Sequence, residues 1–381
     1  MKRGSWPSAA MLILILTILA GPARMETFDY ATGDRVTRMW LPDQALEIRG
    51  ILIQGNGAGS DARRYLNNQA MRGFARLHHF AFIATGYWGN LSGVEIDLWE
   101  QHLDAFSVMS GHPELRHAPW LPLGFSNGGQ MSYGFNALRP KKVIGFIANK
   151  GGYYNDPLPP EAALETPGIL VAGELDTEFR RTAIRTIFFE NRARGARWAW
   201  VEEQGMAHES DAERLLLPFM HECMVLRYPP DQVPTATSGV ELNNLPEDSG
   251  WLADPSSWSQ PLTFISEYDA YPGENRLAAW LPDAGTAFAY RAFATRCKWL
   301  EKTGFGMIGD RPLYIEVPDF SEYWHRIPAP APVFQPVSID TSEYPFWADV
   351  TFFSLDRPLL RIVGDGDPHG HAAGILELDS G

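Results

Sequence analysis

A serine flanked by glycines is the clearest site for chemistry in this sequence. The segment reads Gly124-Phe125-Ser126-Asn127-Gly128. A G-x-S-x-G segment supports nucleophilic catalysis when a strand leads into it and a helix follows, since the sharp turn holds the serine hydroxyl at the helix N-terminus. There the free N–H groups and the helix dipole favour developing negative charge. Ser126 is therefore the candidate nucleophile, with simple capping of the following helix as its structural alternative.

Two later segments supply a base and an orienting acid, which a serine hydroxyl needs before it can attack a carbonyl. One apolar run, over 168–173, is followed by Asp176, and another, over 198–201, leads to His208. After a serine turn of this kind the acid and the histidine follow along the chain in this order. We expect all three side chains at the carboxyl edge of one sheet, where parallel sheets bind ligands.

The acid and the base each have competitors in the sequence. Asp176 could merely cap the helix that begins at Thr177, and the acid could instead be Glu174 or Asp156. The chain has ten histidines, but only His208 follows the last predicted strand in the required place. The triad predicted from the sequence is therefore serine, Asp176 and His208, with the two other carboxylates as alternatives for the acid.

The tetrahedral transition state of acyl transfer needs two N–H donors for its oxyanion. The geometry of the serine turn makes the backbone N–H of Asn127 the first donor. The second is expected from the loop after the first core strand, residues 55–59, whose three glycines let the backbone approach a substrate closely. Gly57 or Ala58 would supply that N–H, and the alternative is an ordinary flexible turn.

Other loops at the same edge predict the walls of a substrate pocket. Tyr87 and Trp88 follow one apolar run, and Lys150 and Tyr153 follow another. The aromatic rings could stack on a sugar or an aromatic acyl group, or they could fill the core below. Lys150 could attract an anionic substrate, or it could pair with an acid.

Acidic and histidine side chains alternate near the C-terminus, and this pattern can bind a divalent metal. They are Asp365, Asp367, His369 and His371. Gly and Pro between them are equally typical of a solvated polar loop, which is the commoner case. The triad chemistry requires no metal and no organic cofactor, so none is expected.

The elements that position these residues alternate along the chain from about residue 36 to residue 228. Short apolar runs predict buried strands of a parallel sheet, and stretches with apolar spacings of three and four predict helices between them. The runs cover 51–53, 80–84, 120–123, 143–147, 169–172 and 198–201. This pattern predicts a doubly wound, mostly parallel α/β sheet. Pro119 and Pro122 are unusual for a central strand, so the strand before Ser126 must be short or irregular.

The remaining segments suggest four parts. Lys2 and Arg3, an apolar stretch over 11–20 and small residues after it predict a secretory signal peptide over 1–23. An exported or periplasmic protein without a stable membrane span is therefore expected, because ten apolar residues are too short to cross a bilayer. The signal is followed by a catalytic domain over 24–228, a proline-rich linker over 229–260 and a smaller β-rich, possibly sandwich-like region over 261–381.

Composition narrows the class of partner. The 381-residue chain is 45% hydrophobic, enough for a large core, and its formal net charge is −14. Nucleic acids and anionic membranes attract basic surfaces, so neither is expected as a partner. The two cysteines, Cys223 and Cys297, are too few for a disulfide framework or a zinc site; they could pair with each other or remain buried thiols.

The glycine-rich loop over 55–59, the serine turn, the turn at Asp176 and His208 together resemble the α/β-hydrolase superfamily. The resemblance is nearest to secreted branches that are dienelactone-hydrolase-like, acetylxylan- or feruloyl-esterase-like and polyester-depolymerase-like, and it covers about residues 36–228. Phe125 stands where these proteins often have His, and Asn127 where Ala or Gln is frequent. Dienelactone hydrolases proper have cysteine in place of Ser126, which argues against their substrate.

The triad chemistry and the resemblance together imply a serine hydrolase that cleaves carboxylic esters through an acyl-enzyme. Its substrate would be a small-molecule ester or an acyl group linked to a polysaccharide. Amide or peptide hydrolysis uses the same groups and is the nearest alternative. A binding protein built on a hydrolase scaffold, without catalysis, is the alternative from another class.

Overall fold

The computed structural model of the chain describes most residues between 26 and 294 and the backbone of six later strands. The described ranges are 26–42, 47–86, 88–203, 206–209, 212–256 and 263–294. The predicted signal peptide, Tyr87, Cys297 and the Asp/His loop over 365–371 lie outside the described residues. Within the described residues no helix has the length and apolarity to cross a membrane.

Eight strands form one sheet in the order β1-β2-β4-β3-β5-β6-β7-β8. The strands are β1 (Glu26–Thr32), β2 (Arg35–Leu41), β3 (Gly50–Gly55), β4 (Phe80–Gly86), β5 (Trp120–Phe125), β6 (Phe146–Asn149), β7 (Gly168–Gly173) and β8 (Trp198–Glu203). From β4 to β8 neighbouring strands run parallel, whereas β1 and β2 form an antiparallel hairpin whose second strand pairs antiparallel with β4. The mostly parallel sheet confirms the predicted fold class.

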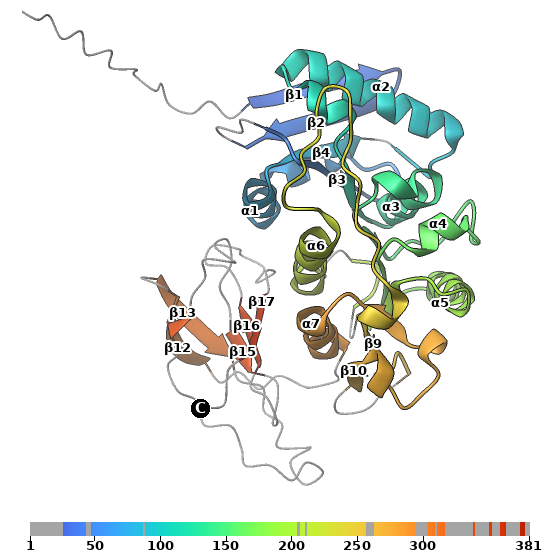
Figure 1. Cartoon of the computed structure of the whole chain (residues 1–381), viewed down its shortest axis with the longest axis vertical. Helices are drawn as coiled ribbons and strands as arrows, with labels where there is room; N and C mark the ends of the chain where they lie inside the picture. The colour runs from blue at the N-terminus through green and yellow to red at the C-terminus, as the bar shows by residue number, and fades with distance from the viewer. Residues whose placement is uncertain are drawn as a thin grey trace, which may run out of the picture.

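Helices cover both faces of this sheet. They are α1 (Gln69–His78), α2 (Gly93–Ser110), α3 (Asn127–Leu138), α4 (Glu161–Leu164), α5 (Glu178–Ala193), α6 (Glu213–Arg227) and α7 (Ala284–Ala294). Figure 1 shows α1, α6 and α7 along one face and α2, α3 and α5 along the other. The strands between them are buried on both sides, and every residue of β3, β4, β7 and β8 is buried. Their near-continuous apolar sequence follows from this double coverage.

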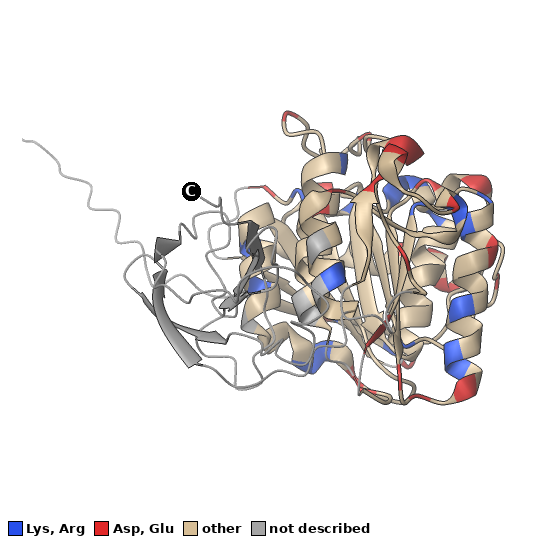
Figure 2. Ribbon diagram, turned by 90° about the horizontal axis from the view of Figure 1, so that it is seen from below, with Lys and Arg blue, Asp and Glu red and all other residues tan. Residues whose placement is uncertain are grey.

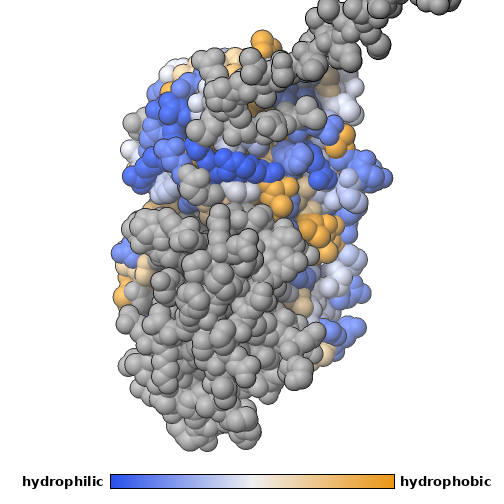
Figure 3. All heavy atoms as spheres, turned by 90° about the vertical axis from the view of Figure 1, so that its left-hand side faces the viewer, coloured by the Kyte–Doolittle hydropathy of each residue, from blue (hydrophilic) through white to orange (hydrophobic). Residues whose placement is uncertain are grey.

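Charged residues lie mainly on the outer helices and loops, while the strands between the helices carry few of them (Figure 2). On the face shown in Figure 3, hydrophilic residues cover much of the described surface and apolar residues form only small groups. Isolated apolar residues on a surface are normal for a folded protein. Most buried apolar residues in the described part of the chain thus belong to one large core around the sheet.

At Pro122 in the central strand β5, a serine hydroxyl joins β5 to its neighbour β6. The Ser132 hydroxyl donates to the Pro122 carbonyl at 2.7 Å and accepts from the Ile147 N–H at 3.2 Å. Trp120 pairs with Val143 just before β6, and regular pairing between β5 and β6 starts after the proline, where Leu123 lies opposite Ile147. Pro119 precedes the strand, and its carbonyl accepts the Ile51 N–H. The irregularity expected in this strand is therefore a place where the Ser132 hydroxyl from α3 bridges β5 and β6 in place of a direct backbone hydrogen bond.

Residues 229–245 are not a spacer between two bodies. Figure 1 shows this segment leaving the end of α6, running along the sheet and returning. The Asn243 N–H donates to the Arg227 carbonyl, and the Arg227 guanidinium donates to the Asn243 carbonyl and to the carbonyls of Val143 and Ile144. Gly239 lies against the His117 carbonyl, ahead of β5. The segment covers the amino edge of the sheet, opposite the predicted site.

Residues 251–294 extend the same core, which corrects the predicted domain boundary at residue 228. Three short strands, in the order β10-β9-β11, pair antiparallel. They are β9 (Trp251–Ala253), β10 (Ile265–Glu267) and β11 (Ala279–Leu281). Side chains of β9, β11 and α7 join the main hydrophobic cluster, and the Tyr290 hydroxyl donates to the Trp200 carbonyl in β8. The buried Arg192 of α5 donates to the carbonyls of Ala278 and Asn275.

The predicted C-terminal β-rich region contains a six-stranded sheet in the order β14-β12-β13-β15-β16-β17. The strands are β12 (Thr303–Ile308), β13 (Arg311–Glu316), β14 (Ser338–Ile339), β15 (Val350–Phe352), β16 (Leu359–Ile362) and β17 (Gly374–Glu377). The strands β15 and β16 pair antiparallel.

The serine bridge at Pro122 can be tested by the Ser132→Ala substitution. Losing the hydroxyl leaves a buried carbonyl and a buried N–H without their shared partner, so we expect the free energy of unfolding to fall by about 1–3 kcal/mol. Urea unfolding followed by tryptophan fluorescence measures this change. Ser107→Ala is the matched control, because the Ser107 hydroxyl donates to the Leu103 carbonyl, which keeps its helical partner. Equal losses in the two variants would contradict the bridge.

Candidate active site

Three side chains from separate loops meet in one hydrogen-bonded chain at the carboxyl edge of the sheet. His208 Nε2 lies 2.9 Å from the Ser126 hydroxyl, and His208 Nδ1 lies 2.7 Å from Asp176 Oδ2. The structure thus brings together the serine, the histidine and the acid singled out by the sequence. With the Nδ1 proton directed at the carboxylate, Nε2 is free to accept the serine proton, as a general base requires.

Ser126 sits in a strained turn between β5 and α3. Its backbone has φ 56° and ψ −119°, a conformation rare for residues with a side chain. The Ser126 N–H donates to the Asn149 carbonyl at 2.7 Å, and the Ser126 carbonyl accepts from the N–H groups of Gly129 and Gln130. The turn is therefore fixed by the end of β6 and by the first turn of its own helix.

Glycines make this turn possible because backbones touch there. A Cβ on Gly128 would lie 2.3 Å from the Gly55 carbonyl carbon, and a Cβ on Gly124 would lie 2.4 Å from the Gly128 carbonyl carbon. No side chain fits at such distances. The close packing brings the end of β3 against the start of α3, so the loop after β3 lies beside the serine.

Asp176 is held by several donors at the turn after β7. Its Oδ1 accepts the Thr177 N–H at 2.7 Å and the Arg180 guanidinium at 3.1 Å, while Oδ2 faces His208. Burial, the largest single influence, acts to raise the pKa of Asp176. Hydrogen bonds from His208 and Thr177, the charge of His208 and the hydrogen bond from Arg180 outweigh it, so the pKa lies below its ordinary value of 3.8. The carboxylate therefore stays ionised beside the imidazole.

The two alternative acids make other contacts. The Glu174 N–H donates to the Glu203 carbonyl, which places Glu174 at the start of the turn that carries Asp176. The Asp156 carboxylate accepts the Leu158 N–H, and the Asp156 carbonyl accepts the Tyr133 hydroxyl. Of the three carboxylates considered from the sequence, Asp176 is the one hydrogen-bonded to His208.

The loop that carries His208 packs directly on the acid turn. The Leu175 N–H donates to the Met206 carbonyl, and a Cβ on Gly173 would lie 2.1 Å from the Ala207 carbonyl oxygen. The Phe125 ring lies against the imidazole with centroids 4.8 Å apart. The histidine side chain remains 29% exposed, so a substrate can reach it from solvent.

The loop expected to complete an oxyanion hole lies against the serine. A Cβ on Gly57 would be 3.7 Å from Ser126 Cβ and 3.9 Å from its hydroxyl oxygen, which is ordinary van der Waals contact. The Gly57 carbonyl accepts the Ser60 N–H in a tight turn, and Ala58 is exposed at its tip. Asn127 is the first residue of α3, and its side-chain amide donates to the Trp88 carbonyl.

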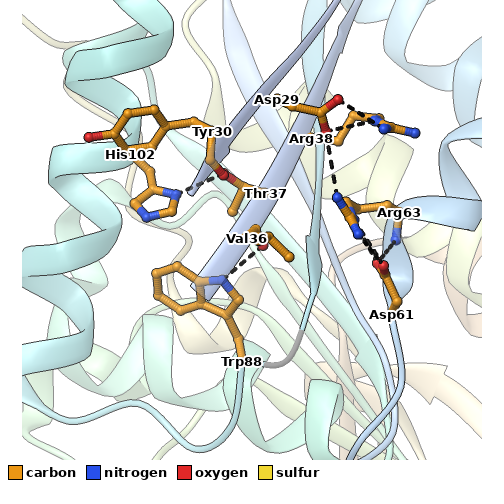
Figure 4. A network of polar contacts seen from close by, with 9 residues as sticks. All are labelled: Asp29, Tyr30, Val36, Thr37, Arg38, Asp61, Arg63, Trp88 and His102. Atoms are coloured by element: carbon orange, nitrogen blue, oxygen red, sulfur yellow. Dashed lines mark hydrogen bonds and ion pairs between the residues drawn. The ribbon is translucent and has the colours of Figure 1, made fainter. Parts of the chain in front are cut away.

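An ion-pair network on the β1–β2 hairpin supports this loop (Figure 4). Asp61, directly after the loop, accepts from the Arg63 N–H and guanidinium, and Arg63 also lies 3.7 Å from Asp29 of β1. Arg38 of β2 donates to the same Asp29 carboxylate through two nitrogens. The apolar pattern did not predict this hairpin. Its ion pairs hold the first turn of η1 (Ala62–Asn67) in place, and with it the glycine loop that precedes η1.

Two residues proposed as pocket walls turn into the core instead. The Trp88 side chain is 4% exposed, and its indole N–H donates to the Val36 carbonyl (Figure 4). Its ring packs edge-on against the rings of His102 and Trp99. Lys150 is fully buried and pairs with Glu203. The substrate-binding role predicted for both residues is corrected: Trp88 fills the core and Lys150 pairs with an acid, which were the alternatives considered for them. Tyr153 is 64% exposed.

Gln130 links the loops around the serine and was not singled out from the sequence. Its amide nitrogen donates to the Asn90 side chain at 2.6 Å and to the Asn127 side chain at 3.1 Å. Its amide oxygen accepts the N–H groups of Gly152 and Tyr153. Only its position one helical turn after Ser126 could have indicated this role.

A cavity of about 190 Å³ lies beside this group, between α3 and the loops after β4 and β6. Its polar lining comes from Asn90, Gln130, Tyr133, Asn155 and Asp156, together with Ser92. No cluster of three or more metal-binding side chains occurs among the residues that the structure describes.

No protein-family model matches the sequence, and no curated protein matches it either. Solved structures with a similar shape include esterase PE8, 21% identical, with a TM-score of 0.35 over 45% of this chain and 89% of that one. A ferulic acid esterase is 12% identical, with a TM-score of 0.39 over 49% and 91% of the two chains. The poly(3-hydroxybutyrate) depolymerase LpqC from Bordetella parapertussis is 16% identical, with a TM-score of 0.38 over 49% and 86%.

The fold itself rests on this chain's own geometry. A mostly parallel sheet, a serine turn between the fifth strand and its helix, and a later acid and histidine in that order are the features of the α/β-hydrolase fold. The similar structures each align with half of this chain or less.

The lowered pKa of Asp176 predicts how stability changes with pH. A carboxylate with a depressed folded-state pKa stabilises the fold above its unfolded value and loses that contribution as pH falls through the folded value. We therefore expect Asp176→Asn to be less stable than the wild type near pH 7, with the difference shrinking below about pH 4.

Urea unfolding at a series of pH values measures this difference. Asp156→Asn is the matched control, because that carboxylate contacts its own loop rather than His208. A difference between wild type and Asp176→Asn that is the same in acid and at neutral pH would show that the contacts of Asp176 do not favour its ionised form.

Proposed function

We propose that the protein is a serine hydrolase that cleaves carboxylic esters through an acyl-enzyme. The observation that carries the proposal is the continuous hydrogen-bond chain from the Ser126 hydroxyl through His208 to Asp176. It combines a nucleophile in a strained turn, a base within proton-transfer distance and an ionised acid that fixes the base. Each of these features is needed for acyl transfer, and a purely structural serine needs none of them.

The mechanism follows from the positions of the atoms. The Ser126 oxygen attacks the ester carbonyl while His208 Nε2 takes its proton, and Asp176 stabilises the imidazolium that forms. Backbone N–H groups of Asn127 and of Gly57 or Ala58 stabilise the oxyanion of the tetrahedral intermediate. The intermediate collapses, and the imidazolium protonates the departing alcohol. Water then attacks the acyl-enzyme with His208 as base and releases the acid.

The substrate we propose is a small-molecule ester or an acyl group linked to a polysaccharide. The exposed Tyr153 ring supports an aromatic or sugar group near the site, since such rings offer a flat apolar face. The amide-lined cavity beside Gln130 supports a polar, hydroxyl-bearing portion, because amides can donate to and accept from hydroxyl groups.

The nucleophile is tested by Ser126→Ala. We expect kcat on an aryl acetate to fall by about 10⁴-fold or more, since neither His208 nor Asp176 can replace the missing nucleophilic oxygen. Labelling by a fluorophosphonate probe should disappear as well. Ser110→Ala is the matched control, because the Ser110 hydroxyl lies at the end of α2, where it donates to the Phe106 carbonyl and accepts the His112 N–H, and it contacts no triad residue.

Two results would overturn the proposal. Full turnover by Ser126→Ala would remove the serine from the mechanism, and a wild type that neither hydrolyses esters nor takes up the probe would favour a binding protein. Anilides that match the esters distinguish amide hydrolysis, which the same triad could perform. A panel of acetyl, feruloyl and longer acyl esters then identifies the acyl group.

We also propose that the protein is exported to the periplasm or the medium. The support is the order of Lys2 and Arg3, a ten-residue apolar stretch and the small residues that follow. Mass spectrometry of the mature chain from the exported fraction should place its first residue just after about residue 23. Replacing Lys2 and Arg3 by acidic residues should reduce export, and an intact N-terminus on exported chains would rule out cleavage there.

A further inference from the structure

A fully buried ion pair lies directly under the proposed active site. Lys150 Nζ is hydrogen-bonded to a Glu203 carboxylate oxygen, and the two side chains are 0% and 1% exposed. Lys150 directly follows β6, and Glu203 is the last residue of β8. The strand between them, β7, leads into the turn that carries Asp176. The pair therefore joins two strands across the one that bears the acid.

The lysine end of the pair is tied to the nucleophile. The Asn149 carbonyl accepts the Ser126 N–H, and Asn149 immediately precedes Lys150. Lys150 itself has φ 52°, and its N–H donates to the Val171 carbonyl in β7. A side chain in this left-handed region costs free energy and persists only where its surroundings fix it. The strained lysine is thus fixed one residue away from the carbonyl that holds the serine turn.

The glutamate end is tied to the acid and the base. The Glu203 carbonyl accepts the Glu174 N–H, at the start of the turn that leads to Asp176. The chain that continues from Glu203 supplies the Met206 carbonyl to the same turn and then reaches His208. Any shift of the Glu203 backbone would therefore move both the acid turn and the histidine loop.

Stability alone does not account for the pair. Removing two charges from water costs several kcal/mol for each ion, and well-packed apolar side chains of similar volume are often equally or more stabilising. What a buried ion pair can add is a defined geometry between its two ends. Here those ends are the strand ends that carry the serine support on one side and the acid and base on the other.

We propose that Lys150 and Glu203 are positioning residues for the triad, which set the distance between Ser126 and His208 by locking the ends of β6 and β8 together across β7. The proposal rests on the proposed serine chemistry. It assigns the lysine no contact with substrate. Its effect should therefore be on kcat and on the reactivity of the serine, with little effect on KM.

The test is the double substitution Lys150→Met/Glu203→Met, which removes both charges at similar volume and leaves neither unpaired. We expect kcat on an aryl acetate, per folded molecule, to fall by about 10- to 100-fold, because small displacements of reacting groups have effects of that size. The rate of fluorophosphonate labelling should fall in parallel, while KM stays within about twofold. Urea unfolding gives the folded fraction.

The matched control is Arg181→Met/Glu202→Met. This pair, with its nearest atoms 3.2 Å apart, uses the neighbouring residue of β8 but leads outward to α5. It should keep kcat and the labelling rate near the wild type. Glu203→Gln is the second arm, because it removes the charge and keeps the shape; a smaller fall in kcat is expected.

The outcomes separate the two proposals. Wild-type protein that shows neither turnover nor labelling refutes the serine chemistry itself. If the wild type is active and Lys150→Met/Glu203→Met matches the control in kcat and labelling, the positioning role is overturned. Should that double variant fail to fold, an unchanged kcat in Glu203→Gln overturns the positioning role equally. A rise in KM with kcat unchanged would also overturn it, because it would indicate contact with the substrate.

Discussion

The geometry around the serine depends on one close contact between backbones. Gly128 packs on Gly55 so tightly that no Cβ fits, and this contact fixes where α3 begins relative to β3. The strained Ser126 conformation and the approach of the glycine loop are both consequences of it. The strain is offset by hydrogen bonds from the end of β6 and from α3 itself. The nucleophile is therefore held by the sheet and needs no mobile loop to place it.

The acid and the base lie on the loops that follow the next two strands, β7 and β8. β7 ends in the turn of Asp176, and β8 continues into the loop of His208, with the two joined by backbone hydrogen bonds. On the other side of the serine, the β1–β2 hairpin and its arginine–aspartate network support the loop expected to hold the oxyanion. The central helix α3 relates the two sides, because it contacts β3 on one side and β6 on the other.

The sequence was sufficient for the parallel strands and for the meeting of serine, acid and histidine, because buried strands are continuous apolar runs and their ends share one edge. The sequence was insufficient where the direction of a side chain decides whether it faces the site or the core. Trp88 and Lys150 follow strands just as Asp176 does, yet their side chains point inward. There the Trp88 indole donates to the Val36 carbonyl, and Lys150 forms an ion pair with Glu203. The β1–β2 hairpin was missed because its strands alternate with charged residues such as Arg38. Pro122 looked disruptive because the hydroxyl that bonds its carbonyl belongs to Ser132, which lies on another element, α3.

The packing of residues 251–294 against β8 has a consequence for the order in which the chain is made. Ribosomes release the triad first, since His208 precedes the segment whose side chains complete the core around β8. Tyr290 donates to a β8 carbonyl, and Arg192 finds its acceptors at Asn275 and Ala278. Until these residues emerge, the Arg192 guanidinium lacks its carbonyl acceptors, and the apolar edge of β8 lacks the side chains that pack on it. The catalytic half is therefore expected to complete its core only after residues 251–294 have been made.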